Sequence, residues 1–159
     1  MNDLEAIRRL IALYPQLLDA KRLEEWGGLL AEDAIFDVFG RTLRGRAEIV
    51  REIGAMQPAA PLKHAVFAPI IELDDVDRAR GKPRRSAAAR NEGEARVETA
   101  RAWTDFATFA SGPSGISVAN FATYHDRLAK RDGRWQIAHR TIVSAGEPPP
   151  PGVGPVPSD

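Results

Sequence analysis

The segment that most constrains the fold is residues 120–143, NFATYHDRLAKRDGRWQIAHRTIV. Two runs of strand-forming residues flank Asp132-Gly133, a dipeptide that tolerates the positive φ angles of a tight hairpin turn. In the second run, strict alternation predicts one shared face for Trp135, Ile137, His139, Thr141 and Val143. In the first run, Tyr124 and Asp126 share one face, opposite Thr123, His125 and Arg127. The segment therefore predicts a long antiparallel β-hairpin.

Three helices are predicted before this hairpin. Residues 1–20 carry apolar side chains at steps of three and four, namely Leu4, Ile7, Ile11, Tyr14 and Leu18. Asn2 and Glu5 have the spacing of a capping box, and Pro15 predicts a kink. Residues 23–30 predict a short second helix that contains Trp26, and residues 45–56 predict a third.

The remaining regular segments predict strands. They are residues 34–39, preceded by a turn at 31–33, residues 64–73, where Pro69 indicates an edge or a bulge, and residues 94–109. Helices that precede a run of strands indicate an α+β protein, with the helices packed on one face of an antiparallel sheet. The length of 159 residues suits one domain, which we expect to span residues 1–145.

Two segments depart from these patterns. The insertion at 74–93 has six basic and no acidic residues between Arg78 and Arg90. It is interpreted either as a surface loop or as an electrostatic contact for an anionic ligand or partner. Residues 146–159 are rich in proline and glycine without apolar periodicity, so we expect a disordered tail.

Composition excludes several classes of protein. The chain has 22 basic and 22 acidic residues, a balance that argues against a dedicated nucleic-acid binder. It has no cysteine, so disulfides, thiolate metal sites and cysteine nucleophiles are excluded. No apolar run approaches the roughly 18 residues that span a bilayer, and the charged N-terminus is unlike a signal peptide. A cytoplasmic protein with no membrane partner is the expectation.

Several short sequence motifs, or marks, occur together in an order that is typical of one protein superfamily. They are Tyr14-x4-Asp19, Trp26, Ala31-Glu32-Asp33-Ala34-x-Phe36, Gly45-Arg46-x2-Ile49, His64, Tyr124-x-Asp126 and Asp132-Gly133-Arg134-Trp135-x-Ile137-x2-Arg140. In these marks the chain resembles the SnoaL-like branch of the nuclear-transport-factor-2-like superfamily. The resemblance implies a curved antiparallel sheet wrapped around the helices, like a cone with an open end and an apolar pocket. The superfamily includes polyketide cyclases, dehydratases, isomerases, hydrolases, dioxygenase small subunits and binding proteins, so fold alone does not give function.

The resemblance is closest to scytalone-dehydratase-like and bile-acid-dehydratase-like members, and it implies four catalytic positions. Tyr14, Asp19 and His64 match a helix tyrosine, an acid five residues later and a histidine that begins a long strand. The fourth position, a polar partner on the next strand, falls on Asp105, with Thr104 as the rival. In this reading His64 and Asp105 form a base dyad, Tyr14 polarises a carbonyl group, and no metal or organic cofactor is required.

Structural roles remain open for these residues. Tyr14 also fits a core position, Asp19 a turn cap, His64 a solvated strand start, and Asp105 a cross-strand ion pair. The expected pocket wall consists of Trp26, Phe36, Trp103, Tyr124, Trp135 and His139, where His139 is either a second candidate base or a core histidine.

The leading expectation is a cofactor-independent lyase or isomerase, dehydratase-like or cyclase-like, that acts on a small hydrophobic hydroxy or keto substrate. The alternative is a non-catalytic ligand-binding or protein-association domain, and a hydrolase based on Arg101 and Asp105 ranks third. A homodimer is expected, with a trimer as the alternative.

Overall fold

The computed structural model describes residues 1–74 and 98–154. In chain order the elements are α1 (Asp3–Asp19), α2 (Leu23–Gly27), β1 (Leu30–Val38), β2 (Arg41–Arg44), α3 (Arg46–Ala55), β3 (Leu62–Val66), β4 (Ile70–Asp74), β5 (Glu98–Gly112), β6 (Gly115–Arg131) and β7 (Arg134–Ser144). The basic segment from Arg78 to Arg90 lies outside the described residues. Among the described residues, no helix combines the length and the apolarity needed to cross a membrane.

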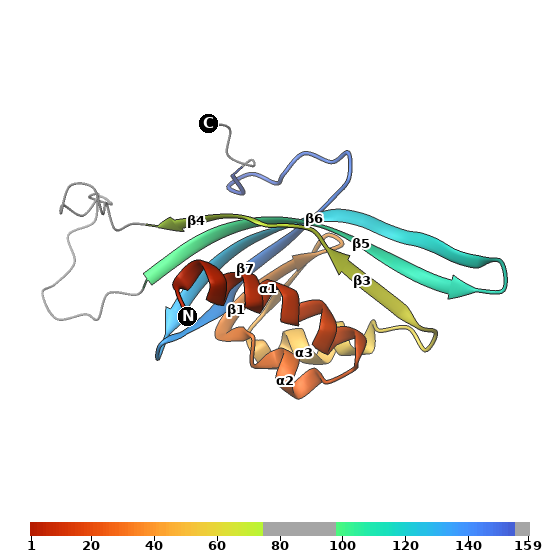
Figure 1. Cartoon of the computed structure of the whole chain (residues 1–159), viewed down its shortest axis with the longest axis horizontal. Helices are drawn as coiled ribbons and strands as arrows, with labels where there is room; N and C mark the ends of the chain where they lie inside the picture. The colour runs from red at the N-terminus through yellow and green to blue at the C-terminus, as the bar shows by residue number, and fades with distance from the viewer. Residues whose placement is uncertain (75–97, 155–159) are drawn as a thin grey trace, which may run out of the picture.

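The strands form one sheet in the order β2-β1-β7-β6-β5-β3, with β4 also paired to β5. All neighbours are antiparallel except β1 and β7, which run parallel. The three helices lie on one side of this curved sheet, and the segment after β7 lies on the other side (Figure 1). The expected α+β architecture is confirmed. We call the helix-covered side the inner face and the opposite side the outer face.

Helix α1 forms as its sequence pattern predicts. The side-chain carbonyl oxygen of Asn2 accepts a 2.9 Å hydrogen bond from the backbone N–H of Glu5 and caps the helix. The apolar stripe that includes Ile7, Ile11 and Tyr14 is buried against the sheet. Pro15 lies inside the helix without ending it. Burial of this stripe stabilises α1 and holds its C-terminal half over the sheet.

Several strand boundaries differ from the prediction, two of them substantially. Strand β1 begins at Leu30, so the turn expected at residues 31–33 is wrong. The single strand expected at residues 64–73 is instead β3 and β4, which both pair with β5 and are separated by a break that contains Pro69. Proline has no backbone N–H to donate to a neighbouring strand, so pairing with β5 is interrupted near Pro69.

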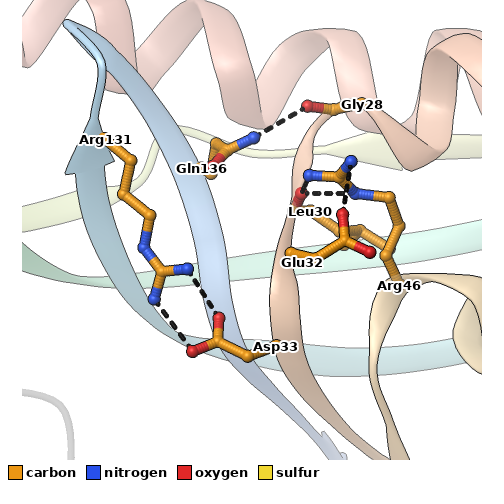
Figure 2. A network of polar contacts seen from close by, with 7 residues as sticks. All are labelled: Gly28, Leu30, Glu32, Asp33, Arg46, Arg131 and Gln136. Carbon is orange, nitrogen blue, oxygen red and sulfur yellow. Dashed lines mark hydrogen bonds and ion pairs between the residues drawn. The ribbon is translucent and has the colours of Figure 1, made fainter.

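Polar contacts account for some of the marks around β1 (Figure 2). The guanidinium of Arg46, at the start of α3, donates to the carbonyl oxygen of Leu30 at 3.0 and 2.7 Å and forms a 2.9 Å ion pair with Glu32. Arg131, before the β6–β7 turn, binds both carboxylate oxygens of Asp33 at 2.7 and 3.1 Å. These residues therefore tie β1 to α3 and to the hairpin, which is a structural role.

A β-bulge in β7 changes which side chains share a face. Leu128 pairs with Ile137 and Arg127 with His139, so Ala138 is an extra residue on β7. The prediction that side chains alternate strictly along the whole of β7 is therefore wrong. Trp135 and Ile137 are buried under the helices, whereas His139 borders an outer-face cavity. Arg140, one residue further on, lies on the inner face and is fully buried.

The inner face contains one fully buried ion pair. The Arg140 guanidinium donates to both carboxylate oxygens of Asp126 at 2.7 and 2.6 Å, and neither side chain is exposed. The guanidinium carbon lies 4.0 Å from the ring centre of Tyr14 and 3.8 Å from that of Tyr124. Cation–π attraction from two rings and the bidentate carboxylate together offset the cost of burying the charge.

Removal of one member of this pair should destabilise the fold strongly. Asp126→Leu would leave the Arg140 charge buried without its partner, so we expect the free energy of unfolding to fall by roughly 3–5 kcal/mol. The double variant Asp126→Leu/Arg140→Met removes both charges and should recover most of that loss. Urea unfolding followed by circular dichroism measures both. A single variant as stable as the parent, or a double variant no better than the single, would contradict this account.

Candidate functional site

A cavity of about 220 Å³ opens between the inner face of the sheet and the helices. Its wall is mostly apolar, with a few polar groups, and consists of Tyr14, Leu18, Phe36, Val38, Phe39, Ile53, Met56, Gln57, Pro58, Leu62, His64, Phe106, Thr108, Ala119, Asn120, Tyr124 and Ile142. An apolar cavity with a few convergent polar side chains is the usual form of a small-molecule site.

The histidine of this cavity is paired with a carboxylate from α1. His64 Nδ1 lies 2.5 Å from Asp19 Oδ1, and the His64 backbone N–H donates to Asp19 Oδ2 at 3.0 Å. Only 10% of the His64 side chain and 7% of the Asp19 side chain are exposed. Because Asp19 accepts the proton on Nδ1, the other ring nitrogen can act as a base. No partner for Nε2 of His64 is found within residues 1–74 and 98–154.

The imidazole of His64 belongs to a row of rings. It stacks on Phe106 with a centroid distance of 6.2 Å, and Phe106 stacks on Tyr124 at 3.9 Å. Tyr14 meets the edge of Tyr124 at 5.7 Å. The row therefore fixes the orientation of His64 and brings it to the same cavity wall as both tyrosines.

Burial keeps the phenol of Tyr14 protonated. Burial raises the pKa of Tyr14 to about 12, although the charge and hydrogen bonding of Arg140 oppose the shift. Burial also raises the pKa of Tyr124 well above its ordinary value. For Arg140, burial would lower the pKa, but the charge and hydrogen bonds of Asp126 outweigh burial and raise it. The site thus combines a permanent cation with two neutral hydroxyl donors.

Three buried side-chain polar atoms lack a hydrogen-bond partner among the described residues: Nε1 of Trp26, Oγ1 of Thr104 and Nη1 of Arg140. Thr104 is opposite Tyr124 in the strand register and is fully buried. Buried polar atoms without a partner are rare in proteins and indicate positions where a ligand or water binds. All three lie outside the wall of the cavity.

Asp105 is not the partner of His64. Its side chain is on the opposite side of β5 from Phe106 and accepts a 2.6 Å hydrogen bond from the Thr123 hydroxyl on exposed surface. Successive residues of a strand point to opposite faces, so Asp105 and the inward-facing Phe106 cannot both reach the cavity. The expected His64–Asp105 dyad is wrong, and Asp19 occupies that role geometrically.

The expected pocket wall is divided among three places. Phe36 and Tyr124 line the cavity. Trp26 lies in the core beside Tyr14, with ring centres 5.3 Å apart, and the Trp135 indole N–H donates to Asp3 at 2.9 Å, so neither reaches the cavity. Trp103 and His139 are on the outer face, where His139 Nε2 donates to Asp37 at 2.6 Å. Assigning Trp26, Trp135, Trp103 and His139 to this pocket is therefore wrong.

Sequence reasoning did not select several residues that the structure brings to the site. Arg140 has no predicted role in the site beyond being a mark of the resemblance, and Thr108, Asn120 and Phe39 are not among the predicted pocket residues. The pattern Tyr124-x-Asp126 correctly places both side chains on one face. Finding Arg140 beside them required the bulge at Ala138, which strict alternation does not predict.

A metal centre is not evident in the part of the chain that the structure describes. Across residues 1–74 and 98–154, no three or more His, Asp or Glu side chains lie close enough together to hold a metal ion.

The fold and the cavity define a cone-shaped α+β protein with an apolar pocket that a few polar side chains also line. A sequence model of the SnoaL-like domain matches residues 1–141, so the chain belongs to the SnoaL-like family. No curated protein sequence is similar enough to this chain to count as a match.

Solved structures show the same fold at low identity. An NTF2-like protein with a cystatin-like fold from Novosphingobium aromaticivorans is 21% identical, with a TM-score of 0.66 over 91% of this chain and 82% of its own. A candidate scytalone dehydratase from the same organism is 16% identical (TM-score 0.65; 90% and 84% covered). ActVI-ORFA from Streptomyces coelicolor is 12% identical (TM-score 0.68; 91% and 98% covered). These likenesses establish the NTF2-like, cystatin-like fold.

The buried tyrosines give a prediction for alkaline pH. Tyr14 and Tyr124 are the only two tyrosines of the chain, so absorbance of the phenolate ion reports on them alone. We expect no ionisation near pH 10 in the folded protein, because the pKa of Tyr14 is about 12 and that of Tyr124 is also raised. Unfolded tyrosine ionises near pH 10, so the contribution of Tyr14 to stability is complete below about pH 10 and is lost progressively toward pH 12.

A pH titration of phenolate absorbance, run beside thermal unfolding at each pH, measures both effects. Tyr14→Phe provides the control, since it leaves a single tyrosine, Tyr124. Ionisation of either residue near pH 10 without unfolding would contradict the described burial.

Proposed function

We propose that this SnoaL-like protein is a cofactor-independent lyase or isomerase that removes a proton from carbon next to a carbonyl group. The observation that carries the proposal is the 2.5 Å contact between His64 and Asp19 at the wall of an apolar cavity that Tyr14 also lines. The substrate class is a small hydrophobic hydroxy ketone or ketone.

The first step is proton abstraction by His64. Nε2 takes the proton from the α-carbon, and the C–H electron pair forms an enolate. Asp19, bound to Nδ1, holds the ring in the correct tautomer and stabilises the imidazolium that results. Imidazole suits this role because its ordinary pKa lies close to neutral pH.

The second step stabilises the enolate oxygen. Tyr14 is a hydrogen-bond donor that remains protonated at neutral pH because burial raises its pKa to about 12. The Arg140 cation, 4.0 Å from the Tyr14 ring centre, favours negative charge on the phenol and therefore strengthens its donation. The enolate is thus met by a donor whose orientation is set before substrate binds.

The third step determines the product. In a dehydration, the His64 imidazolium gives its proton to a β-hydroxyl group, the C–O bond breaks, and an enone and water form. In an isomerisation, the same proton returns to a different carbon of the enolate. Both reactions conserve all atoms and electrons without a metal or an organic cofactor.

The volume of the cavity limits the substrate. At about 220 Å³ it is smaller than the roughly 300–1,000 Å³ typical of sites for drug-sized ligands. A substrate with one or two rings therefore fits this site better than a four-ring steroid. Phe39 and Met56, both exposed members of the cavity wall, lie where such a substrate would meet solvent.

Proton abstraction can be tested apart from any leaving group. We expect the protein to catalyse exchange of the α-protons of α-tetralone for deuterium, measured by proton NMR in deuterated buffer. His64→Gln should lower the exchange rate by about 10²–10⁴-fold, because the general base is lost. Tyr14→Phe should lower it by about 10²–10³-fold, because one donor to the enolate oxygen is lost.

The matched control is His125→Gln, which makes the same change at a histidine on the outer face. It should leave the rate within about twofold, since His125 does not contact the cavity. The β-hydroxy ketone that gives benzalacetone on dehydration distinguishes the two activities. A lyase would convert it to benzalacetone and water, whereas an isomerase would not. If tetralone binds but exchanges no faster than with free imidazole, the protein is a ligand-binding domain and the proposed chemistry is wrong.

A further inference from the structure

The outer face of the sheet carries a second polar surface, unrelated to the cavity under the helices. Trp103 of β5 and His125 of β6 are paired across the strands, and Arg127 follows on β6 two residues further on the same face. All three side chains carry N–H donors. We call this surface the outer groove.

The segment after β7 lies over the outer groove (Figure 1). The Trp103 indole N–H and His125 Nδ1 both donate to the carbonyl oxygen of Gly154, at 3.4 and 3.3 Å. The Arg127 guanidinium donates to the carbonyl oxygen of Gly152 at 3.3 Å. Three side chains from two strands thus bind backbone carbonyls of a single short segment.

The chemistry of the segment explains why carbonyl groups are the contacts. Residues 147–154, EPPPPGVG, contain four consecutive prolines, which have no N–H and cannot pair their neighbours' carbonyls in a helix or sheet. Consecutive prolines favour an extended conformation that loses little entropy on binding. The segment then turns at residues 150–153, where the Val153 N–H donates to the Pro150 carbonyl at 3.0 Å, and this turn presents the carbonyls of Gly152 and Gly154 to the sheet. Surfaces that bind them use aromatic rings and N–H donors that meet the free carbonyls.

The chain's own segment fills this surface incompletely. A cavity of about 380 Å³ remains between the sheet and the segment, lined on one side by Pro150, Pro151 and Val153. On the other side its floor includes Thr141 and the Asp37–His139 pair, which are hydrogen-bonded to one another and form no hydrogen bond with the described part of the segment, residues 147–154. The three hydrogen bonds to the segment are also long. The outer groove can therefore hold a bulkier segment of the same chemistry.

We propose that the outer groove is a docking site for proline-rich peptide segments, and that residues 147–154 occupy it in cis and compete with such a partner. A tethered segment acts at a high effective concentration, so even weak contacts occupy the groove in the free protein. A partner with more contacts displaces the segment, and the displaced segment then becomes exposed.

The test uses an end-blocked peptide of residues 146–154, GEPPPPGVG, and two forms of the protein. One is the full chain and the other ends at Gly146. The shortened chain retains all seven described strands, and no residue from 144 to 154 belongs to the buried core, so it should fold. Calorimetry should detect binding to the shortened chain, and binding to the full chain should be at least about tenfold weaker, because its own segment competes.

Substitutions in the shortened chain locate the binding site. Trp103→Phe keeps an aromatic ring but removes the N–H donor, and should weaken peptide binding by about fivefold. Arg127→Gln should weaken it similarly, whereas Arg22→Gln, the same change on the helix side of the molecule, should leave it unchanged. A peptide with alanine at the four proline positions should bind more weakly, since the unbound chain is less extended.

Three results would overturn the proposal. The first is equal affinity of the peptide for the two forms of the protein. The second is unchanged affinity after Trp103→Phe and Arg127→Gln. The third is a shortened chain that forms dimers in sedimentation experiments and does not bind the peptide, in which case a second copy of the chain is the occupant. None of these results depends on His64 or on activity in the inner cavity.

Discussion

The structure depends on the way the Arg140 charge is accommodated inside the sheet. The guanidinium is held by Asp126 and by the faces of Tyr14 and Tyr124, so one buried cation joins β6, β7 and α1. A desolvated cation is stable only where all these partners are in place. Packing of α1 on the sheet and the position of the Tyr14 hydroxyl are therefore parts of one arrangement, and the candidate site inherits its rigidity from that ion pair.

The two faces of the sheet differ in chemistry because side chains alternate along most of each strand, and the bulge at Ala138 is one of the places where the register shifts. On the inner face, Tyr124 and Asp126 meet helix α1, and on the outer face His125 and Arg127 meet the C-terminal segment. The bulge at Ala138 divides the side chains of β7 in the same way, so that Arg140 faces inward and His139 faces outward. This extra residue places the His139–Asp37 pair on the side of the sheet opposite to the His64–Asp19 pair.

Local patterns in the sequence predicted the elements well, because they reflect local physics. The cap at Asn2, the stripe of α1 and the Asp132-Gly133 turn depend on neighbours in the chain, and the structure has all three, with φ angles of 50° and 74° at the turn. The faces of β5 were not predictable in this way. Trp103 on one face and Phe106 on the other are both large and apolar, so hydrophobicity could not tell which face meets the helices.

The same limitation explains why the sequence predicts Asp105, with Thr104 as the rival, as the partner of His64. A strand neighbour is a natural expectation for a residue on a strand, but Asp19 reaches His64 across the sheet–helix interface, 45 residues away in the chain. Asp19 is the last residue of α1, where the helix dipole disfavours negative charge, and no basic residue occupies the last turn. Groups of β3 compensate for this unfavourable position of the Asp19 carboxylate. They are the backbone N–H and imidazole of His64 and the ammonium of Lys63, whose nitrogen lies 3.2 Å from Asp19 Oδ2. These contacts stabilise the Asp19 carboxylate at the end of α1 and hold it against Nδ1 of His64.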